Sequence, residues 1–247
     1  MTPPLDKSSQ KIQRMFDSVA PKYDFLNHFL SLGIDRHWRN KTARIVSESI
    51  LELPADVPLL DVCCGTGDLC FAFERQLRQS GQSYQRKIIG IDFSEKMLEI
   101  ARQKSISNHS GITFQPGDAT DIPFEDETFA AVSNAFGLRN TSDTLRCISE
   151  MSRVCKKNGT LAVLEFSVPS LPVFRQCYLL YFRYILPLIS GLFSRNSTDA
   201  YNYLPASVLT FDSPQQLIQR MEETGLQDCR TIPLTFGIAA LTIGRKK

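Results

Sequence analysis

Residues 59–68 read Leu-Leu-Asp-Val-Cys-Cys-Gly-Thr-Gly-Asp, and this stretch decides the fold. The short apolar run 59–63 predicts a buried strand, and 68–77 has the pattern of a helix. Gly65 and Gly67 lie in the turn between them, where residues without a Cβ let a ligand approach the backbone closely. Ligands of parallel α/β sheets bind at the carboxyl ends of the strands, so this turn is a candidate ligand-binding site.

The alternation of strands and helices continues beyond this turn. Short apolar runs are separated by helical patterns, which is typical of a parallel sheet with helices on both faces. We expect Ser94 to begin one helix as its N-cap and Asn158-Gly159 to end another as its C-cap. The expected strands are 87–91, 112–115, 129–135, 160–166, 227–234 and 237–244, and the expected helices are 94–104, 144–157 and 214–224.

We interpret residues 1–247 as a single α/β domain. No internal repeat or low-complexity tract is visible, but the rhythm of strands and helices breaks after Val168. The expected parts are an N-terminal helical segment at 1–53, a cofactor-binding core at 58–168, an apolar insertion at 169–210, and a C-terminal helix and hairpin at 211–247.

The composition argues against several classes of protein. The 28 Lys+Arg and 26 Asp+Glu give a net charge of +2, which disfavours a nucleic-acid-binding protein. No apolar run reaches the ~20 residues of a membrane span, and residues 1–14 lack the apolar stretch of a signal peptide. Seven cysteines without paired spacing predict a reducing, cytoplasmic compartment. The three histidines are too scattered for a ligand cluster, so we expect no metal.

The glycine turn can be compared with known nucleotide-binding motifs. A phosphate-binding P-loop requires Gly-Lys-Ser/Thr, but Asp68 follows Gly67 here. A dinucleotide-binding turn needs a third glycine or an alanine, and Cys70 stands at that position. Asp61 and Asp68 would also repel a pyrophosphate. The turn therefore favours a ligand that carries positive charge and no phosphate, such as S-adenosylmethionine.

Two further acids follow expected strands. Asp92 ends the second strand, where a carboxylate can accept hydrogen bonds from both hydroxyls of a ribose. Asp118 follows the third strand and can accept from an adenine amino group. A Gly-x-Gly turn or a single aspartate is by itself equally consistent with a purely structural role. Three acids and a glycine turn, all at strand ends, together predict a cofactor site.

A set of motifs is spread along nearly the whole chain. They are the glycine turn 61–68, Asp92, Gly-Asp-Ala-x-x-Ile-Pro-Phe at 117–124, Phe-Gly-Leu-Arg-Asn at 136–140, Phe-Asp-Ser-Val-Ala-Pro-Lys-Tyr-Asp at 16–24 and Leu-Thr-x-Gly-Ile-x-Ala-Leu at 234–241. With these motifs the chain resembles the C-methyltransferases of menaquinone and ubiquinone biosynthesis over about residues 15–245. The glycine turn alone indicates only a class I methyltransferase, whereas the motifs at 16–24 and 136–140 are far more specific.

The resemblance implies an α/β fold of the Rossmann-like class I methyltransferase type, whose seven-stranded, mostly parallel sheet has an antiparallel last strand. It implies methyl transfer from S-adenosylmethionine to a ring carbon of a polyprenylated hydroquinone, giving menaquinol from demethylmenaquinol, or the ubiquinone-pathway counterpart. Ala135 replaces a serine that many members use near the cofactor, so we leave Ala135 out of the site. The predicted cofactor-binding residues are Asp61, Gly65, Thr66, Gly67, Asp92, Asp118 and Ala119.

Carbon methylation needs a phenolate, because a neutral hydroquinone carbon is a poor nucleophile. The predicted catalytic residues are Tyr23, Asp24, Arg139 and Asn140. Arg139 would stabilise the phenolate, since a guanidinium almost never acts as a free base, and Asn140 would orient the same oxygen. Asp24 and His37 are the candidate bases, and Tyr23 could hydrogen-bond cofactor or substrate. The alternatives are a structural loop for Arg139-Asn140 and a packing role for His37.

The segment 177–193 is the most apolar part of the insertion. It is too short to span a bilayer comfortably, and Arg183 and Pro187 interrupt it. One interpretation is a buried helix or the interface of a homodimer. The other is a lid that receives a prenyl tail during peripheral contact with the inner face of a membrane.

Three other functions remain open on the sequence alone. The first is methylation of another lipid or small molecule, and the second is non-catalytic binding of S-adenosylmethionine or of a prenylated quinone. The third is a nicotinamide-dependent dehydrogenase, which the missing third glycine already disfavours.

Overall fold

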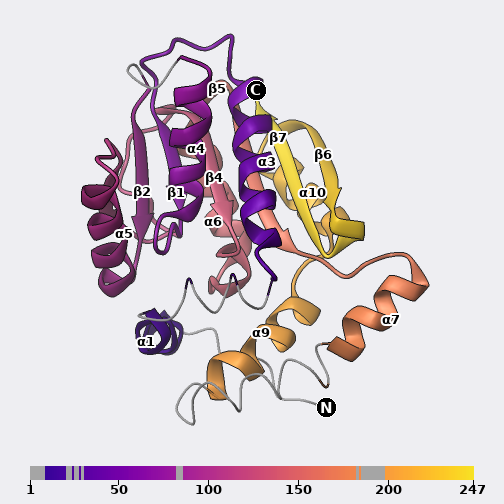
Figure 1. Cartoon of the computed structure of the whole chain (residues 1–247). Coiled ribbons are helices and arrows are strands. Elements are labelled where there is room, and N and C mark those ends of the chain that lie inside the picture. The colour runs from indigo at the N-terminus through magenta and orange to yellow at the C-terminus, as the bar shows by residue number, and fades with distance from the viewer. Residues whose placement is uncertain are drawn as a thin grey trace.

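The protein is built around a seven-stranded mixed sheet. The computed structural model describes residues 9–20, 24, 28, 31–81, 86–181, 184 and 198–247. The strands are β1 (Leu59–Val62), β2 (Ile88–Asp92), β3 (Thr113–Pro116), β4 (Phe129–Ala135), β5 (Cys155–Phe166), β6 (Leu226–Leu234) and β7 (Ala239–Lys246). They lie in the order β3-β2-β1-β4-β5-β7-β6 (Figure 1). The last strand, β7, is antiparallel to both neighbours and the other pairs are parallel, which confirms the expected fold.

Helices cover both faces of this sheet. They include α1 (Ser9–Val19), α3 (Ile34–Ser49), α4 (Asp68–Gln79), α5 (Glu95–Ser107), α6 (Thr144–Val154), α7 (Pro172–Leu180), α9 (Thr198–Thr210) and α10 (Pro214–Glu223), with short 3-10 helices at η2 (Leu138–Asn140) and η4 (Thr235–Gly237). α3, α4 and α5 pack on one face, and α6 and α10 pack on the other (Figure 1). Ser94 caps α5 as expected, because its side chain accepts a hydrogen bond from the Met97 amide.

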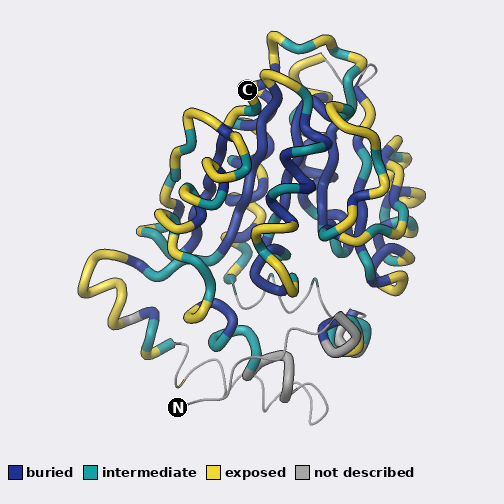
Figure 2. The backbone as a smooth tube through the Cα atoms, turned by 180° about the vertical axis from the view of Figure 1, so that it is seen from behind, coloured by how far each residue is buried: buried dark blue, intermediate teal, exposed yellow. Residues whose placement is uncertain are grey.

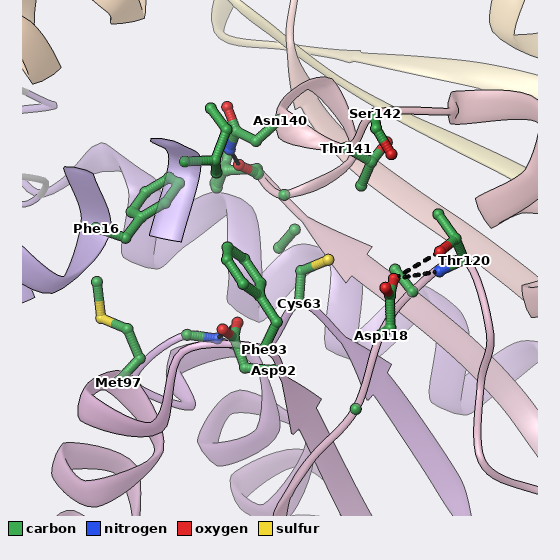
Figure 3. A pocket seen from close by; sticks show the side chains of 17 residues that line it. Phe16, Cys63, Asp92, Phe93, Met97, Asp118, Thr120, Asn140, Thr141 and Ser142 are labelled. Atoms are coloured by element: carbon green, nitrogen blue, oxygen red, sulfur yellow. Dashed lines mark hydrogen bonds between the residues drawn. The ribbon is translucent and has the colours of Figure 1, made fainter. Parts of the chain in front are cut away.

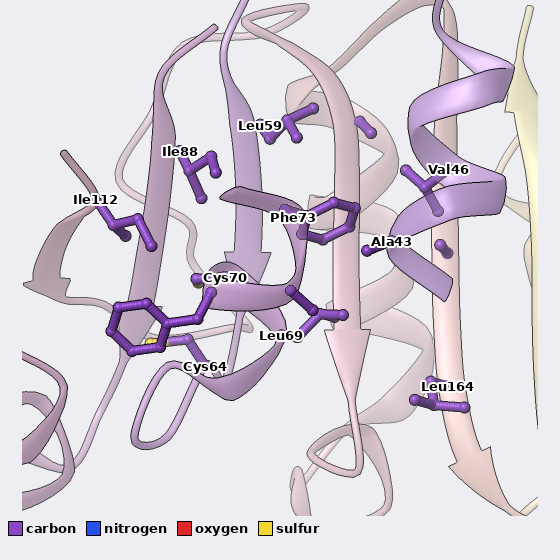
Figure 4. Packing of buried hydrophobic residues seen from close by; sticks show 14 of the residues in the cluster. Ala43, Val46, Leu59, Cys64, Leu69, Cys70, Phe73, Ile88, Ile112 and Leu164 are labelled. Atoms are coloured by element: carbon purple, nitrogen blue, oxygen red, sulfur yellow. The ribbon is translucent and has the colours of Figure 1, made fainter. Parts of the chain in front are cut away.

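The core consists of two apolar layers, one on each face of the sheet. Alternate residues of β1 serve the two layers: Leu59 packs toward α3 and α4, whereas Leu60 packs toward α6. Figure 4 shows the first layer, in which Phe73 of α4 lies between the strands and α3. Burying one side chain of this size contributes about 1.5–3 kcal/mol. The central strands are buried on both faces (Figure 2), which explains their continuous apolar sequences.

The predicted helix cap at Asn158-Gly159 is wrong. α6 ends at Val154, and β5 begins immediately at Cys155. Asn158 has φ 63°, and the register of β5 against β4 shifts at this point, so the two residues lie in a bulge at the start of the strand. A Cβ on Gly159 would come within 2.7 Å of the carbonyl oxygens of Ala130 and Lys156. The glycine therefore allows a close backbone approach between strands, which no local pattern reveals.

The carboxyl ends of the parallel strands are covered by α1 and α9. α1 packs against α5 and α9, and α9 also packs against η2, which follows β4. In Figure 1 these helices lie below the sheet, toward which the arrowheads of β1, β2 and β4 point. The N-terminal helix and the late insertion are thereby brought to the edge of the sheet where the glycine turn lies.

The apolar segment 177–193 lies mostly outside the described residues. The structure describes only 177–181, at the end of α7, and 184. The prediction that this segment forms a lid, a dimer interface or a buried helix therefore stays a prediction. Within the described part of the chain, no helix combines the length and apolar character needed to cross a bilayer.

Candidate active site

A pocket lies at the carboxyl ends of the central strands. Its walls come from the loops that follow β1, β2, β3 and β4, and from α1. The empty space between these walls is about 780 Å³, open solvent included. Its place at the carboxyl ends of a parallel sheet, between several loops, makes it the candidate site for a small molecule. Figure 3 shows Asn140 across the pocket from Asp92 and Met97, with Phe16 of α1 closing one side.

The two glycines of the turn after β1 have different roles. Both adopt left-handed backbone conformations, with φ 55° at Gly65 and φ 85° at Gly67. Gly65 lines the pocket. Gly67 does not line it; it is the N-cap residue of α4, and a Cβ there would lie 2.6 Å from the Phe114 ring. Gly65 is therefore placed to meet a ligand, and Gly67 to allow the tight turn that presents it.

Asp92 lines the pocket at the end of β2 and is only 6% exposed. Its Oδ2 accepts a hydrogen bond from the Gly65 amide at 2.8 Å, and its Oδ1 accepts from the Ser94 amide at 2.9 Å. Burial raises the pKa of Asp92 to about 6, although the backbone hydrogen bonds oppose this rise. The carboxylate is thus ionised at neutral pH, held rigidly by two amides, and each oxygen keeps a further lone pair for a ligand.

Asp118 and Ala119 line the opposite wall, after β3. One oxygen of Asp118 accepts hydrogen bonds from both the amide and the hydroxyl of Thr120, each at 2.8 Å (Figure 3). This arrangement fixes the carboxylate and leaves its other oxygen available to a ligand. Ala119 is buried and presents a small apolar surface beside it.

Asp61 and Thr66 do not line the pocket, although the sequence places both in the predicted cofactor set. Asp61 is 2% exposed and accepts hydrogen bonds from the Ser133 hydroxyl at 2.8 Å and the Cys70 thiol at 3.4 Å. Burial raises its pKa to about 7. Thr66 is also buried, and its hydroxyl donates to Asp24. Their assignment to cofactor binding stays a prediction. The hydrogen bonds that the structure shows for them stabilise the glycine turn on the side away from the pocket.

Asp24 ties the N-terminal segment to the glycine turn. Its Oδ1 accepts from the Thr66 hydroxyl at 2.5 Å, and its Oδ2 lies 2.6 Å from the Lys104 ammonium. Lys104 also pairs with Asp68 at 2.9 Å and donates to the Thr66 carbonyl at 3.2 Å. The predicted catalytic residue Asp24 is therefore half of an ion pair. Its neighbour Tyr23 lies outside the described residues.

A second charged cluster continues from this pair. His28, Asp35 and Asp68 place possible metal-ligating atoms within 4.8 Å of one another. Arg39 lies among them, paired with Asp35 and 4.0 Å from Asp68. Burial opposes ionisation of Asp68, yet the charges of Arg39 and Lys104 hold its pKa below the usual value. The negative charge of these acids is already balanced by side chains of the protein.

Arg139 and Asn140 lie together on η2, but only Asn140 lines the pocket. Arg139 is 6% exposed and pairs with Glu165 at 3.0 Å. Asn140 donates to the Phe136 carbonyl at 3.3 Å, while its side-chain oxygen is buried without a hydrogen-bond partner among the described residues. His37 is exposed on α3 and does not line the pocket, so its position supports neither the role of a base in this pocket nor the packing alternative.

Several pocket residues escape the sequence reasoning. Ala135 was left out because it lacks a hydroxyl, yet it lines the pocket. Phe93 could have been predicted, because it directly follows Asp92 at the end of a strand. The lining residues of α1 carry no such signal, because only tertiary packing brings that helix to the pocket. The missed lining residues include Ile12, Phe16, Phe93, Met97, Ala135 and Phe136.

Comparisons with known sequences give full-length matches. Residues 5–246 match the model of the ubiE/COQ5 methyltransferase family. The Ubiquinone/menaquinone biosynthesis C-methyltransferase UbiE of Citrifermentans bemidjiense is 42% identical over 98% of this chain and 99% of its own length. The Demethylmenaquinone methyltransferase of Deinococcus radiodurans is 44% identical over 96% of this chain and 93% of its own.

Solved structures share the fold at lower identity. The [4+2]-cyclase SpnF superimposes with a TM-score of 0.65 at 20% identity and covers 97% of each chain. A SAM-dependent methyltransferase from Aquifex aeolicus gives a TM-score of 0.55 at 15% identity, over 82% of this chain and 90% of its own. These identities establish the fold alone.

The sheet order, the antiparallel last strand and the pocket at the strand ends are those of a class I methyltransferase. The family match and the relatives, which extend over nearly the whole chain, narrow this class. The protein belongs to the ubiE/COQ5 methyltransferase family.

Proposed function

We propose that this methyltransferase uses S-adenosylmethionine to methylate a ring carbon of a polyprenylated hydroquinone, converting demethylmenaquinol to menaquinol. The observation that carries the proposal is the full-length similarity to relatives named for this chemistry, at 42% and 44% identity. One of those names also covers ubiquinone biosynthesis, so the demethylated benzoquinol of that pathway is the second substrate to test.

The pocket fits S-adenosylmethionine, which supplies an electrophilic methyl group when bound. Asp92 would accept hydrogen bonds from the ribose hydroxyls, because backbone amides orient its carboxylate and a carboxylate can accept about four hydrogen bonds. Asp118 would accept from the adenine amino group, with Gly65 and Ala119 offering close contact. The buried oxygen of Asn140, which has no hydrogen-bond partner among the described residues, also indicates a polar ligand on that side.

The proposed substrate half of the site has an aromatic wall with guanidinium groups against it, and one of these, Arg39, lies 5.2 Å from the centre of the Phe136 ring. The rings of Trp38, Phe136 and Phe166 pack with centroids 4.6–6.1 Å apart, and the Arg139 guanidinium lies 5.3 Å from the centre of the Phe166 ring. Because its charge is paired with Glu165, the guanidinium would act on a phenolate by donating a hydrogen bond where little solvent competes. Asn140 would orient the same oxygen. Tyr23 remains a proposed contact of cofactor or substrate.

Asp24 has a weaker case as the base that removes the phenol proton. Its carboxylate would first have to leave the Lys104 ammonium, which is 2.6 Å away. That ion pair favours a role in holding the N-terminal segment against the glycine turn. We therefore propose Arg139 and Asn140 as the residues that act on the ring oxygen.

An apolar surface on α7 and η4 is a candidate contact for the prenyl tail. Val173, Phe174 and Leu180 are exposed on α7, and Phe174 stacks on the exposed Phe236 with ring centroids 4.2 Å apart. We propose that this surface meets a membrane from the cytoplasmic side and receives the tail there. A homodimer that buries the same surface is the alternative.

The test of the proposed function is incubation of the pure protein with methyl-labelled S-adenosylmethionine and each reduced, demethylated quinone. We expect label in menaquinol and a strongly reduced but measurable rate of transfer in Arg139→Ala. Cofactor binding by calorimetry without transfer to either quinol would instead indicate a binding protein. Transfer that Arg139→Ala leaves intact would indicate a methyltransferase for another compound, and binding of NAD(P) would support the dehydrogenase.

A further inference from the structure

Glu165 is a buried acid at the end of β5 that the proposed function does not yet use. It is 3% exposed, and both of its oxygens accept backbone hydrogen bonds. Oε1 accepts from the Arg139 amide at 3.2 Å, and Oε2 accepts from the Phe166 amide at 3.1 Å. Oε2 also accepts from Nη1 of Arg139 at 3.0 Å. One carboxylate therefore joins the end of β5 to η2 and holds the guanidinium.

The contacts of Arg139 all lie on one part of its side chain. Nη1 donates to Glu165 and to the Phe136 carbonyl, and the Phe166 ring lies against the guanidinium. Nε is buried and has no hydrogen-bond partner among the described residues. A buried N–H without an acceptor destabilises a fold, so this donor calls for an acceptor that binds there.

Two further buried polar atoms close by also lack partners within the described part of the chain. The Asn140 side-chain oxygen is one, and the Asn140 amide nitrogen shares the Phe136 carbonyl with Arg139. The Tyr203 hydroxyl of α9, which packs against η2, is the other. Burial raises the pKa of Tyr203, the charge of Arg139 lowers it and that of Glu165 raises it, so the hydroxyl lies within the field of the pair. The Arg139 Nε, the Asn140 oxygen and the Tyr203 hydroxyl are thus three buried polar atoms of η2 and α9 without partners among the described residues.

We propose that Glu165 is the positioning residue for Arg139 in methyl transfer. It binds Nη1 and the backbone amide, so that Nε–H is left for the oxygen next to the ring carbon that is methylated. A hydroquinone hydroxyl both donates and accepts, which matches the unpartnered atoms of Arg139, Asn140 and Tyr203. The inference deepens the proposed function and rests on it, because it assigns the ring oxygen to this edge.

The experiment compares Glu165→Gln and Glu165→Asp with the wild type in kcat, in KM for demethylmenaquinol and in Kd for S-adenosylhomocysteine. The matched control is Glu150→Gln. Glu150 is equally buried, pairs with Arg153 at 2.8 Å and accepts a backbone hydrogen bond from Ile122 at 3.0 Å, but lies outside the pocket lining. Both glutamine variants should lower thermal stability to a similar extent. A loss of kcat that occurs only in Glu165→Gln therefore reports on the positioning of Arg139.

We expect Glu165→Gln to lower kcat about 30- to 100-fold with an unchanged Kd, because a displaced catalytic group loses rate on this scale. Glu165→Asp should recover part of the loss, and Glu150→Gln should stay within about twofold of the wild type. In an Arg139→Ala background the Glu165→Gln change should have no further effect, because the carboxylate acts through the guanidinium. If Glu165→Gln does not fold, Glu165→Asp carries the same cycle with about a tenfold loss.

Two results overturn the inference. One is a kcat of Glu165→Gln within twofold of the wild type. The other is a loss that is equally large in the Arg139→Ala background, which would make Glu165 a structural residue only. Wild-type protein that methylates neither quinol refutes the proposed function before any variant is compared. An active wild type with an active Glu165→Gln variant refutes only the role of Glu165.

Discussion

The carboxylate of Asp92 should control cofactor affinity and its dependence on pH. Its two oxygens are held by the amides of Gly65 and Ser94, so Asp92→Asn must turn its NH2 group toward one of these donors. The variant therefore loses a charge-assisted bond to the ribose and disturbs the turn. This loss is about 1–3 kcal/mol, or roughly 5- to 150-fold in Kd.

The sign of the pH effect follows from the raised pKa of about 6. In the proposed site the ribose hydroxyls bind the ionised carboxylate, so binding should be strongest above pH 6 and should weaken as the pH falls through that value. At pH 5 most of the free protein carries the proton at Asp92, which should raise Kd about tenfold relative to neutral pH. Asp92→Asn has no such proton and should show a flat profile between pH 5 and pH 7.5.

The assay is calorimetric titration with S-adenosylhomocysteine from pH 5 to pH 8. The control is Asp126→Asn, which removes an exposed acid that does not line the pocket and should keep both affinity and pH profile. An unchanged Kd in Asp92→Asn refutes the ribose assignment. So does a pH profile that survives in Asp92→Asn and disappears in Asp61→Asn, because Asp61 is the other buried acid with a raised pKa, about 7.

Three further predictions concern the turn and its support. Asp61→Asn should stabilise the ligand-free protein by about 1–3 kcal/mol at pH 8, where the buried carboxylate is forced to ionise, and the gain should shrink toward pH 4; denaturant titrations at both pH values check this. Gly67→Ala should cost about 2–4 kcal/mol in the same titration, because it adds a clash with Phe114 to a strained φ, whereas Gly81→Ala has φ 74° but open space and should cost only about 1 kcal/mol. Lys104→Met should leave Asp24 unpaired and accelerate proteolysis of the N-terminal segment, as timed digestion would show; an unchanged cleavage rate would contradict this.

The sequence predicts the sheet well because the relevant signals are local. β1, β2, β4 and β5 each carry an apolar run, Asp92 ends β2, and Asp118 lies two residues after β3. The same locality explains the failure at Gly159, whose reason is the carbonyl of Ala130 on a neighbouring strand. A glycine after a helical pattern looks like a cap unless the approach of that strand is known.

The residues that hold the site residues in place could not be predicted from the sequence for a related reason. Glu165 and Arg139 are 26 positions apart, and Asp24 meets Thr66 across 42. Glu165 reads as one more residue in a buried strand until the register of β5 against β4 places it beside η2. Resemblance to a family could supply Arg139 and Asn140 as candidates, but only the packed structure supplies the acid that holds one of them.

The peptide carbonyl of Phe136 has a consequence for redesign. It accepts from both Arg139 and Asn140, while the residue itself lines the pocket and adopts a left-handed φ of 60°. A bulky residue rarely keeps such a backbone conformation unless its surroundings enforce it. The orientation of Arg139 and of Asn140, and the position of the pocket wall at Phe136, therefore all depend on the same peptide group. An engineer who reshapes η2 to admit a different ring should therefore expect the pocket wall formed by Phe136 to move with it.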